Sequence, residues 1–185
     1  MHILRNLGAF ALAVVVFAAS LGPAVADEAR LDSLFDSLAR IDQADWEQIE
    51  DAIWEEWSET GSATLDLLLE RGREAMSAGD TVAAIEHFTA LVETAPTFAE
   101  GYNARATAYF EAGLYGPSMA DIVRVLALEP RHFGALSGLG VILEETGDAS
   151  GALEAFRAAR AIHPHRSDLR EAVERLEAEL QGTEI

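Results

Sequence analysis

Three prolines at a fixed spacing constrain the fold of this chain more than any other feature. Pro96, Pro130 and Pro164 each follow the one before by 34 residues. Within each period, apolar residues recur at intervals of three and four, which predicts helices, and no stretch alternates as a strand would. Gly79 and Gly147 each precede an aspartate and separate two helices, because glycine tolerates the positive φ that follows a helix. A repeated helix pair cannot bury its apolar face alone, so the chain is predicted to be an all-α stack.

These units resemble the tetratricopeptide repeat (TPR) family. Aligned on the prolines, they occupy residues 65–98, 99–132 and 133–166, within a repeat region 61–166. The family's small residue in helix A, the first helix of a unit, falls on Gly72, Ala106 and Gly140. Its large residue in helix B falls on Phe88, Ile122 and Phe156. The resemblance implies a right-handed superhelical stack in which the A helices line a concave groove for a peptide or helix of another protein.

The first 26 residues carry the features of a secretory signal peptide. Arg5 precedes an uncharged run from Leu7 to Gly22, and Ala24 and Ala26 occupy the two small-residue positions of a cleavage site. Since the run is short for a hydrocarbon core of about 30 Å, cleavage is favoured over an uncleaved anchor. We therefore expect the protein outside the cytoplasm, with no membrane insertion after cleavage. The stretch IWEEWSETGSATLDLLLERG resembles TPR proteins of Gram-negative bacteria, which implies a periplasmic location.

The charge balance argues against nucleic acid as a partner. All 13 basic residues are arginines, and 32 residues are acidic. Arg5 is the one basic residue of residues 1–26, which hold no acid, so residues 27–185 carry a net charge of −20. A surface of that sign repels phosphate backbones and anionic lipid. The chain has no cysteine, which removes disulfides, thiolate metal sites and cysteine catalysis.

A helical hairpin is predicted before the repeats, in residues 27–60. Four apolar residues share one face of its second helix, while carboxylates mostly occupy the others: Trp46, Ile49, Ile53 and Trp57. We expect the hairpin, with a turn at residues 41–43, to pack on helix A of the first unit and cover the open N-terminal end of the stack. The alternative is that part of the tryptophan face stays exposed as a docking patch, with Trp54 its most exposed member.

A solvating helix is predicted after the repeats, in residues 167–185. Its apolar residues form one stripe at Leu169, Val173, Leu176 and Leu180, and its other faces are charged. Such a helix would pack its apolar face against the third unit and expose its charged faces to solvent.

No catalytic or metal site is predicted. His163 and His165 flank the third proline, but two ligands at that spacing lack a nearby third. His87 is predicted to be a partly buried packing residue of helix B. Adjacent acids such as Glu144 and Glu145 point in different directions around a helix and do not converge on one substrate atom. Since no phosphate-binding loop or hydrolase motif occurs either, we expect neither enzymatic activity nor a cofactor.

The resemblance places nine side chains on the groove: Leu69, Arg73, Met76, Asn103, Thr107, Phe110, Ser137, Val141 and Glu144. Asn103 is the best candidate for holding the backbone of an extended peptide, because an amide both donates and accepts hydrogen bonds. Chaperone-binding members of the family hold a C-terminal carboxylate with polar groups in this groove. Apolar or small residues stand at such positions here, which argues against that clamp: Leu69, Ala104, Gly134 and Gly138.

The small residues of the groove predict that something approaches its backbone closely. Glycine inside a helix costs roughly 1 kcal/mol relative to alanine, so Gly134 and Gly138 require a reason. A partner segment would supply it, and so would the protein's own N-terminal or C-terminal helix.

These features favour a non-enzymatic adaptor that holds a peptide or helix of another envelope protein. Two other hypotheses stay open from the sequence. One is self-association through the tryptophan face or the groove, which predicts a homo-oligomer. The other is a carrier of a small ligand or metal, which predicts a deep polar pocket in place of an open groove.

Overall fold

The structure is a computed structural model that describes residues 28–40 and 45–183. Within those ranges the chain forms nine helices and no strand, which confirms the all-α prediction. In chain order they are α1 Glu28–Leu38, α2 Trp46–Ser58, α3 Ala63–Ser77, α4 Thr81–Thr94, α5 Ala99–Glu111, α6 Tyr115–Leu128, α7 Phe133–Glu145, α8 Ala149–Ile162 and α9 Ser167–Thr183. The predicted signal peptide and the turn predicted at residues 41–43 lie outside the described residues.

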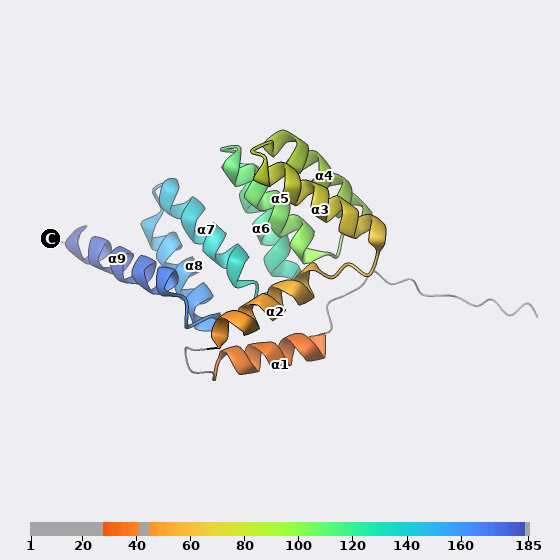
Figure 1. Cartoon of the computed structure of the whole chain (residues 1–185). Coiled ribbons are helices and arrows are strands. Elements are labelled where there is room, and N and C mark those ends of the chain that lie inside the picture. The colour runs from red at the N-terminus through yellow and green to blue at the C-terminus, as the bar shows by residue number, and fades with distance from the viewer. Residues whose placement is uncertain (1–27, 41–44, 184–185) are drawn as a thin grey trace, which may run out of the picture.

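Helices α3 to α8 form three stacked pairs, with α9 beside α8 at the far end (Figure 1). Glycine sets how closely the two helices approach in the first and third pairs. A Cβ on Gly72 would lie 2.2 Å from the ring of Phe88, and one on Gly140 would lie 2.8 Å from the ring of Phe156. Any side chain there would push the pair apart.

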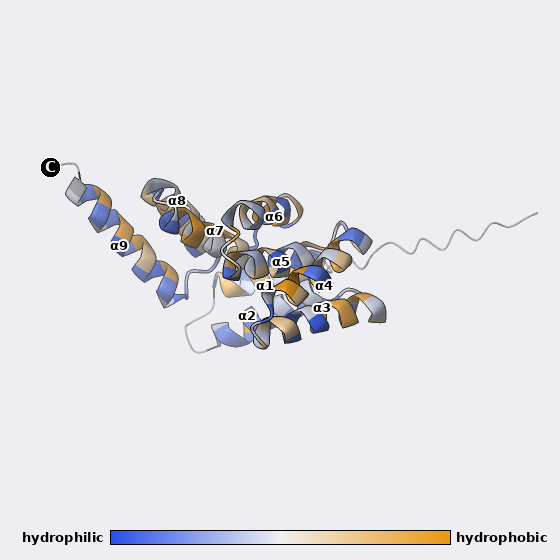
Figure 2. Cartoon of the chain, turned by 90° about the horizontal axis from the view of Figure 1, so that it is seen from above, coloured by the Kyte–Doolittle hydropathy of each residue, from blue (hydrophilic) through white to orange (hydrophobic). Residues whose placement is uncertain are grey.

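Helix α9 covers the open end of the third pair. Its residues Leu169, Val173 and Leu176 are buried in one cluster with Ala152 and Phe156 of α8. Figure 2 shows hydrophilic residues along α9 between the hydrophobic ones, so the faces of α9 that do not contact α8 are hydrophilic. No helix in the described part of the chain is both long and apolar enough to cross a membrane.

The hairpin of α1 and α2 runs beneath the lower ends of the stacked helices in the view of Figure 1. Its packing differs from the prediction. We expected it on helix A of the first unit. Instead, Leu38, Ile53 and Trp57 cluster with Phe133 at the start of α7, and Ile162 at the end of α8 packs against them. The outward face of α3 carries exposed charged residues and cannot bury tryptophan: Asp66, Glu70, Arg71 and Glu74.

Ring contacts fix the hairpin on the third unit. Trp57 is 4% exposed and stacks on His132, with ring centroids 4.1 Å apart and planes at 7°. Trp54 meets the rings of His132 and Phe133 edge-on, at centroid distances of 5.4 Å and 5.5 Å. Trp54 is half-buried in these contacts and does not form the exposed docking patch that the alternative placed there.

Gly134 makes room for Trp54, and we predict that alanine at this position destabilises the protein. A Cβ would lie 2.6 Å from the Trp54 ring, so the ring would have to shift. The clash should outweigh the roughly 1 kcal/mol that alanine normally gains over glycine in a helix. We therefore expect Gly134→Ala to lower the free energy of unfolding by about 1 kcal/mol.

Gly138 is the matched control for this prediction. The atom nearest to a Cβ on Gly138 is Cδ1 of Ile122 at 3.7 Å, an ordinary contact. Gly138→Ala should therefore raise the free energy of unfolding in urea, whereas Gly134→Ala lowers it. Stabilisation by both variants would contradict the close approach of Trp54.

Candidate functional site

A cleft of about 260 Å³ lies between α5 and α7. α5 contributes Asn103, Thr107 and Phe110, and α7 contributes Gly138 and Val141. Two residues of α6, Ser118 and Ile122, also line it. The cleft reaches Gly134, where Trp54 of the hairpin packs. Trp54 of the protein's own N-terminal hairpin thus packs against Gly134 at one end of the cleft, while the part around Gly138 stays open.

The walls of the open part are mostly apolar. Val141 is 37% exposed and is one of five exposed large apolar residues in the described part of the chain. Phe110 is half-buried and stacks on Tyr115, with centroids 5.6 Å apart. Ile122, which is 3% exposed, forms part of the floor of the cleft beside Gly138, where a Cβ would lie 3.7 Å from its Cδ1. An apolar side chain of a ligand would lose its contact with water here.

The polar side chains of the cleft are held by local hydrogen bonds. Nδ2 of Asn103 donates to Oε2 of Glu100 at 2.9 Å. The hydroxyl of Thr107 donates to the backbone oxygen of Asn103 at 3.1 Å, and that of Ser118 donates to the oxygen of Ala106 at 2.7 Å. The side-chain oxygen of Asn103 accepts no hydrogen bond from the described residues, so an acceptor faces outward from α5.

The carboxylate of Glu100 accepts the hydrogen bond from Asn103 and has further partners. This carboxylate is 4% exposed, and Oε1 accepts from Nη2 of Arg73 at 2.9 Å. Nδ1 of His132 accepts from the Ala135 N–H at 3.1 Å, which caps α7 and leaves the imidazole proton on Nε2. That Nε2 lies 3.4 Å from Oε2 of Glu100. The buried carboxylate therefore joins α3 to α5 and lies beside the N-cap histidine of α7, whose Nε2 forms no hydrogen bond within the described residues.

The structure brings together four of the nine residues predicted for the groove: Asn103, Thr107, Phe110 and Val141. The other five lie elsewhere or have other contacts. Leu69 is buried and Met76 half-buried in the core of the first unit. Arg73 pairs with Glu100, and Glu144 pairs with Arg175 of α9. Ser137 donates its hydroxyl to the backbone oxygen of Phe133 at 2.7 Å.

Sequence reasoning missed the buried carboxylate of Glu100, which is 4% exposed, and did not identify that His132 and His163 are fully buried. The one available signal for the histidines was that both lie within two residues of a repeat proline in a chain that has five histidines. No three histidine, cysteine, aspartate or glutamate side chains come together as a metal site in the described part of the chain.

A second polar contact joins the hairpin to the end of α8. Nε2 of His163 donates to Oε2 of Glu50 at 3.1 Å, and the indole of Trp54 donates to Oε1 of Glu50 at 3.3 Å. Nη1 of Arg166 lies 3.4 Å from the same Oε1. The hydrogen bond from His163 is the main cause that holds the pKa of Glu50 below its ordinary value of 4.5, against the opposing effect of its burial.

Glu50→Gln is predicted to weaken the hairpin contact in a pH-dependent way. A carboxylate with a lowered pKa in the folded state adds stability above its unfolded pKa, and this stability is lost as the pH falls through the folded pKa. We expect the variant to unfold more easily at pH 7, by about 1 kcal/mol. The difference should shrink as the pH falls below 4.5. Glu47→Gln, an exposed neighbour on α2, should change stability little at either pH in thermal unfolding. A difference for Glu50→Gln that grew toward pH 3 would contradict the prediction.

Comparison with known proteins agrees with this geometry. A tetratricopeptide repeat profile matches residues 69–116 and 120–167, about half of the chain. A TPR repeat-containing protein of Rhizobium etli is 38% identical over 154 residues, which span 83% of this chain and 76% of that protein.

Solved structures show the same fold. The TPR domain of Sgt2 from Aspergillus fumigatus superposes with a TM-score of 0.62 at 22% identity, over 66% of this chain and 83% of that domain. The first TPR of Spaghetti (RPAP3), bound to the HSP90 peptide SRMEEVD, gives a TM-score of 0.61 at 19% identity, over 63% of this chain and 93% of that one. At such identities the likeness establishes the fold alone.

Proposed function

The chain belongs to the tetratricopeptide repeat family, and from that premise we propose that it is an adaptor that binds a segment of another protein between α5 and α7. The observation that carries the proposal is the open part of the cleft beside Asn103. Asn103 there offers an amide oxygen with no donor among the described residues, next to the apolar walls of Phe110 and Val141.

These groups suit a peptide segment. The oxygen of Asn103 would accept a backbone N–H of the segment, and the Thr107 hydroxyl, which already donates, would accept a second. A cleft of about 260 Å³ holds one apolar side chain and is smaller than the sites of about 300–1,000 Å³ that enclose small ligands. This favours a protein segment over the alternative of a small-ligand carrier.

We place the adaptor in the periplasm, where residues 1–26 would direct it, and its partner among envelope proteins. Support for the location comes from the charged start, uncharged run and small-residue cleavage site of residues 1–26. The net charge of −20 on residues 27–185 favours a neutral or basic partner, because like charges repel.

Affinity capture from envelope extract tests this function. The bait is the chain from Asp27, compared with Asn103→Ala, Thr107→Glu, which removes the amide and adds a charge to the cleft. Thr64→Glu is the matched control, because Thr64 is exposed on α3 and lies outside the cleft. We expect a protein that both the parent and the control retain and the double variant loses, and whose purified segment binds the parent directly.

Two outcomes would overturn the proposal. If the parent and the double variant retain the same proteins, the cleft does not bind them. If the retained species is the chain itself, and light scattering shows a dimer that the double variant no longer forms, the cleft serves self-association.

A further inference from the structure

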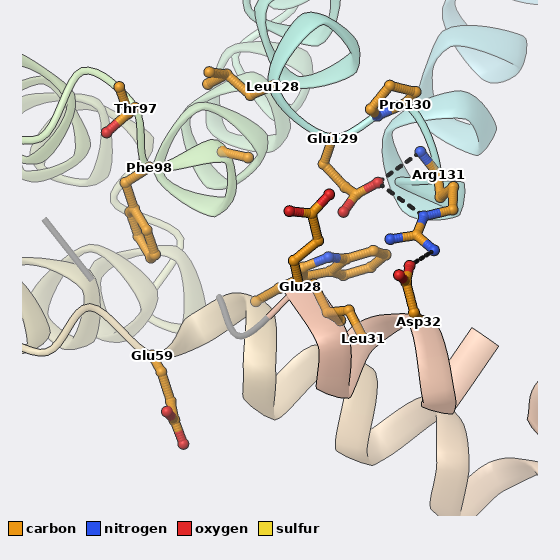
Figure 3. A pocket seen from close by; sticks show the side chains of 12 residues that line it. Glu28, Leu31, Asp32, Glu59, Thr97, Phe98, Leu128, Glu129, Pro130 and Arg131 are labelled. Carbon is orange, nitrogen blue, oxygen red and sulfur yellow. Dashed lines mark hydrogen bonds and ion pairs between the residues drawn. The ribbon is translucent and has the colours of Figure 1, made fainter. Parts of the chain in front are cut away.

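A second cavity lies on the other side of Trp57, away from the α5–α7 cleft. Its volume is about 500 Å³, within the range of small-molecule sites. Four separate parts of the chain meet around it: the start of α1, the end of α2, the loop before α5 and the loop before α7 (Figure 3). Its apolar walls include Leu31, Trp57, Phe98 and Leu128.

Negative charge exceeds positive charge at this cavity. Arg131 donates from Nη1 to Oδ1 of Asp32 at 2.6 Å, and from its backbone N–H to Oε1 of Glu129 at 2.9 Å. Nε of its guanidinium also lies 3.4 Å from the same Oε1 of Glu129, so the guanidinium is shared between two carboxylates. In the view of Figure 3 the carboxylates of Glu28 and Glu129 point toward each other, and both residues line the cavity, while Glu59 points away from both. Glu28 is exposed and forms no ion pair within the described residues.

The cavity also borders a hydrogen-bond donor without an acceptor. Trp57 is 4% exposed, and its indole Nε1 finds no acceptor among residues 28–40 and 45–183. Buried indole N–H groups usually have a partner, since an unpaired one loses its hydrogen bond to water. A ligand that carries an oxygen would supply that acceptor.

We propose that this cavity binds an organic cation: an ammonium or guanidinium on an apolar stem, with a carbonyl oxygen nearby. The cation would lie between Glu28 and Glu129, where low-dielectric walls strengthen the attraction. The stem would pack on Leu31 and Phe98, and the oxygen would accept from Trp57. A lysine or arginine residue of a peptide has these three parts, and so does a free amine that carries an amide.

Other ligand classes fit less well. A phosphate or carboxylate ligand would be repelled by the carboxylates of Glu28, Asp32 and Glu129. A bare divalent cation would leave the apolar walls unused. The inference does not depend on the α5–α7 cleft, because the two sites share no lining residue.

The indole N–H signal of Trp57 in a proton–nitrogen correlation spectrum tests the proposal. The signal is assigned with Trp57→Phe in the chain from Asp27. The probes are acetyl-Gly-Lys-Gly-amide, its norleucine analogue, and 6-aminohexanamide as the free amine. We expect the lysine peptide to move the Trp57 signal saturably at low salt and the norleucine peptide to leave it unmoved. Equal affinity for 6-aminohexanamide would assign a small-molecule site, and a requirement for the peptide would assign a protein segment.

A charge-reversal pair completes the test. Glu28→Lys should weaken the lysine peptide about tenfold, because it removes one attraction and adds a repulsion. Glu93→Lys makes the same charge change at an exposed residue of α4 outside the cavity, and it should weaken binding of the lysine peptide much less. Unchanged Trp46 and Trp54 signals would show that the variants keep their fold. No saturable Trp57 shift with either amine, or equal weakening by both variants, would overturn the proposal.

Discussion

Replacing Trp57 with alanine is expected to lower the free energy of unfolding by about 4 kcal/mol. Trp57 is buried where α1, α2 and α7 meet and contacts the rings of Phe35, His132 and Phe133. Alanine would leave a large cavity there and remove the stack on His132, so the hairpin would lose one of its main contacts with the third unit. Urea unfolding followed by circular dichroism at 222 nm measures the effect.

Leu67→Ala is the control for this large effect. Leu67 is 45% exposed on α3, so its truncation should change stability by about 0.5 kcal/mol or less. The hairpin packing would be contradicted if Trp57→Ala were as mild as Leu67→Ala.

Arg105→Met is expected to cost about 3 kcal/mol, because it leaves a buried carboxylate without its partner. Nε and Nη2 of Arg105 donate to the two oxygens of Asp121 at 2.7 Å and 2.8 Å, and Nη1 donates to Thr89 at 3.3 Å. This pair joins α4, α5 and α6. Hydrogen bonding to Asp121 raises the pKa of Arg105, so its guanidinium stays charged at neutral pH.

The double variant Arg105→Met, Asp121→Leu separates charge pairing from packing. Replacing both partners with apolar side chains removes the uncompensated charge, so the double variant should be more stable than Arg105→Met alone. Chemical unfolding of the two single variants and the double variant completes the cycle. Additive losses would contradict the pairing of Arg105 with Asp121.

Local regularity made the fold predictable. Three features repeat in each unit: the proline, the small residue of helix A and the helical periodicity. Each of these features constrains backbone that lies close to it in sequence. The family match and the structure confirm the resulting all-α stack. Glycines such as Gly72 could be assigned to close helix packing because the requirement comes from one neighbouring helix.

Contacts between distant segments were not predictable in the same way. The tryptophan face of α2 could pack on the first unit or stay exposed, and the repeat pattern does not specify which helix it contacts. Trp57 and His132 are 75 residues apart and meet only in the folded chain. The same holds for Glu50 and His163, whose pairing depends on where the hairpin lies.

The candidate site was half predictable for a related reason. Groove positions on α5 followed from the repeat pattern, so Asn103, Thr107 and Phe110 lie together as expected. The groove positions on α3 did not follow from it, because Arg73 forms an ion pair with Glu100 and Leu69 is buried in the core of the first unit. Ile122 was assigned to helix packing, which its burial agrees with, and it also lines the floor of the cleft.

Site-specific photo-crosslinking tests the central claim, that a partner binds between α5 and α7. A benzophenone amino acid is placed at Val141 in the cleft or at Val123, which is 64% exposed on α6 and does not line the cleft. After irradiation in envelope extract, we expect an adduct with a different protein from position 141, none from the more exposed position 123, and loss of the adduct when Thr107→Glu is added. Equal adducts from both positions, or none from position 141, would contradict the claim.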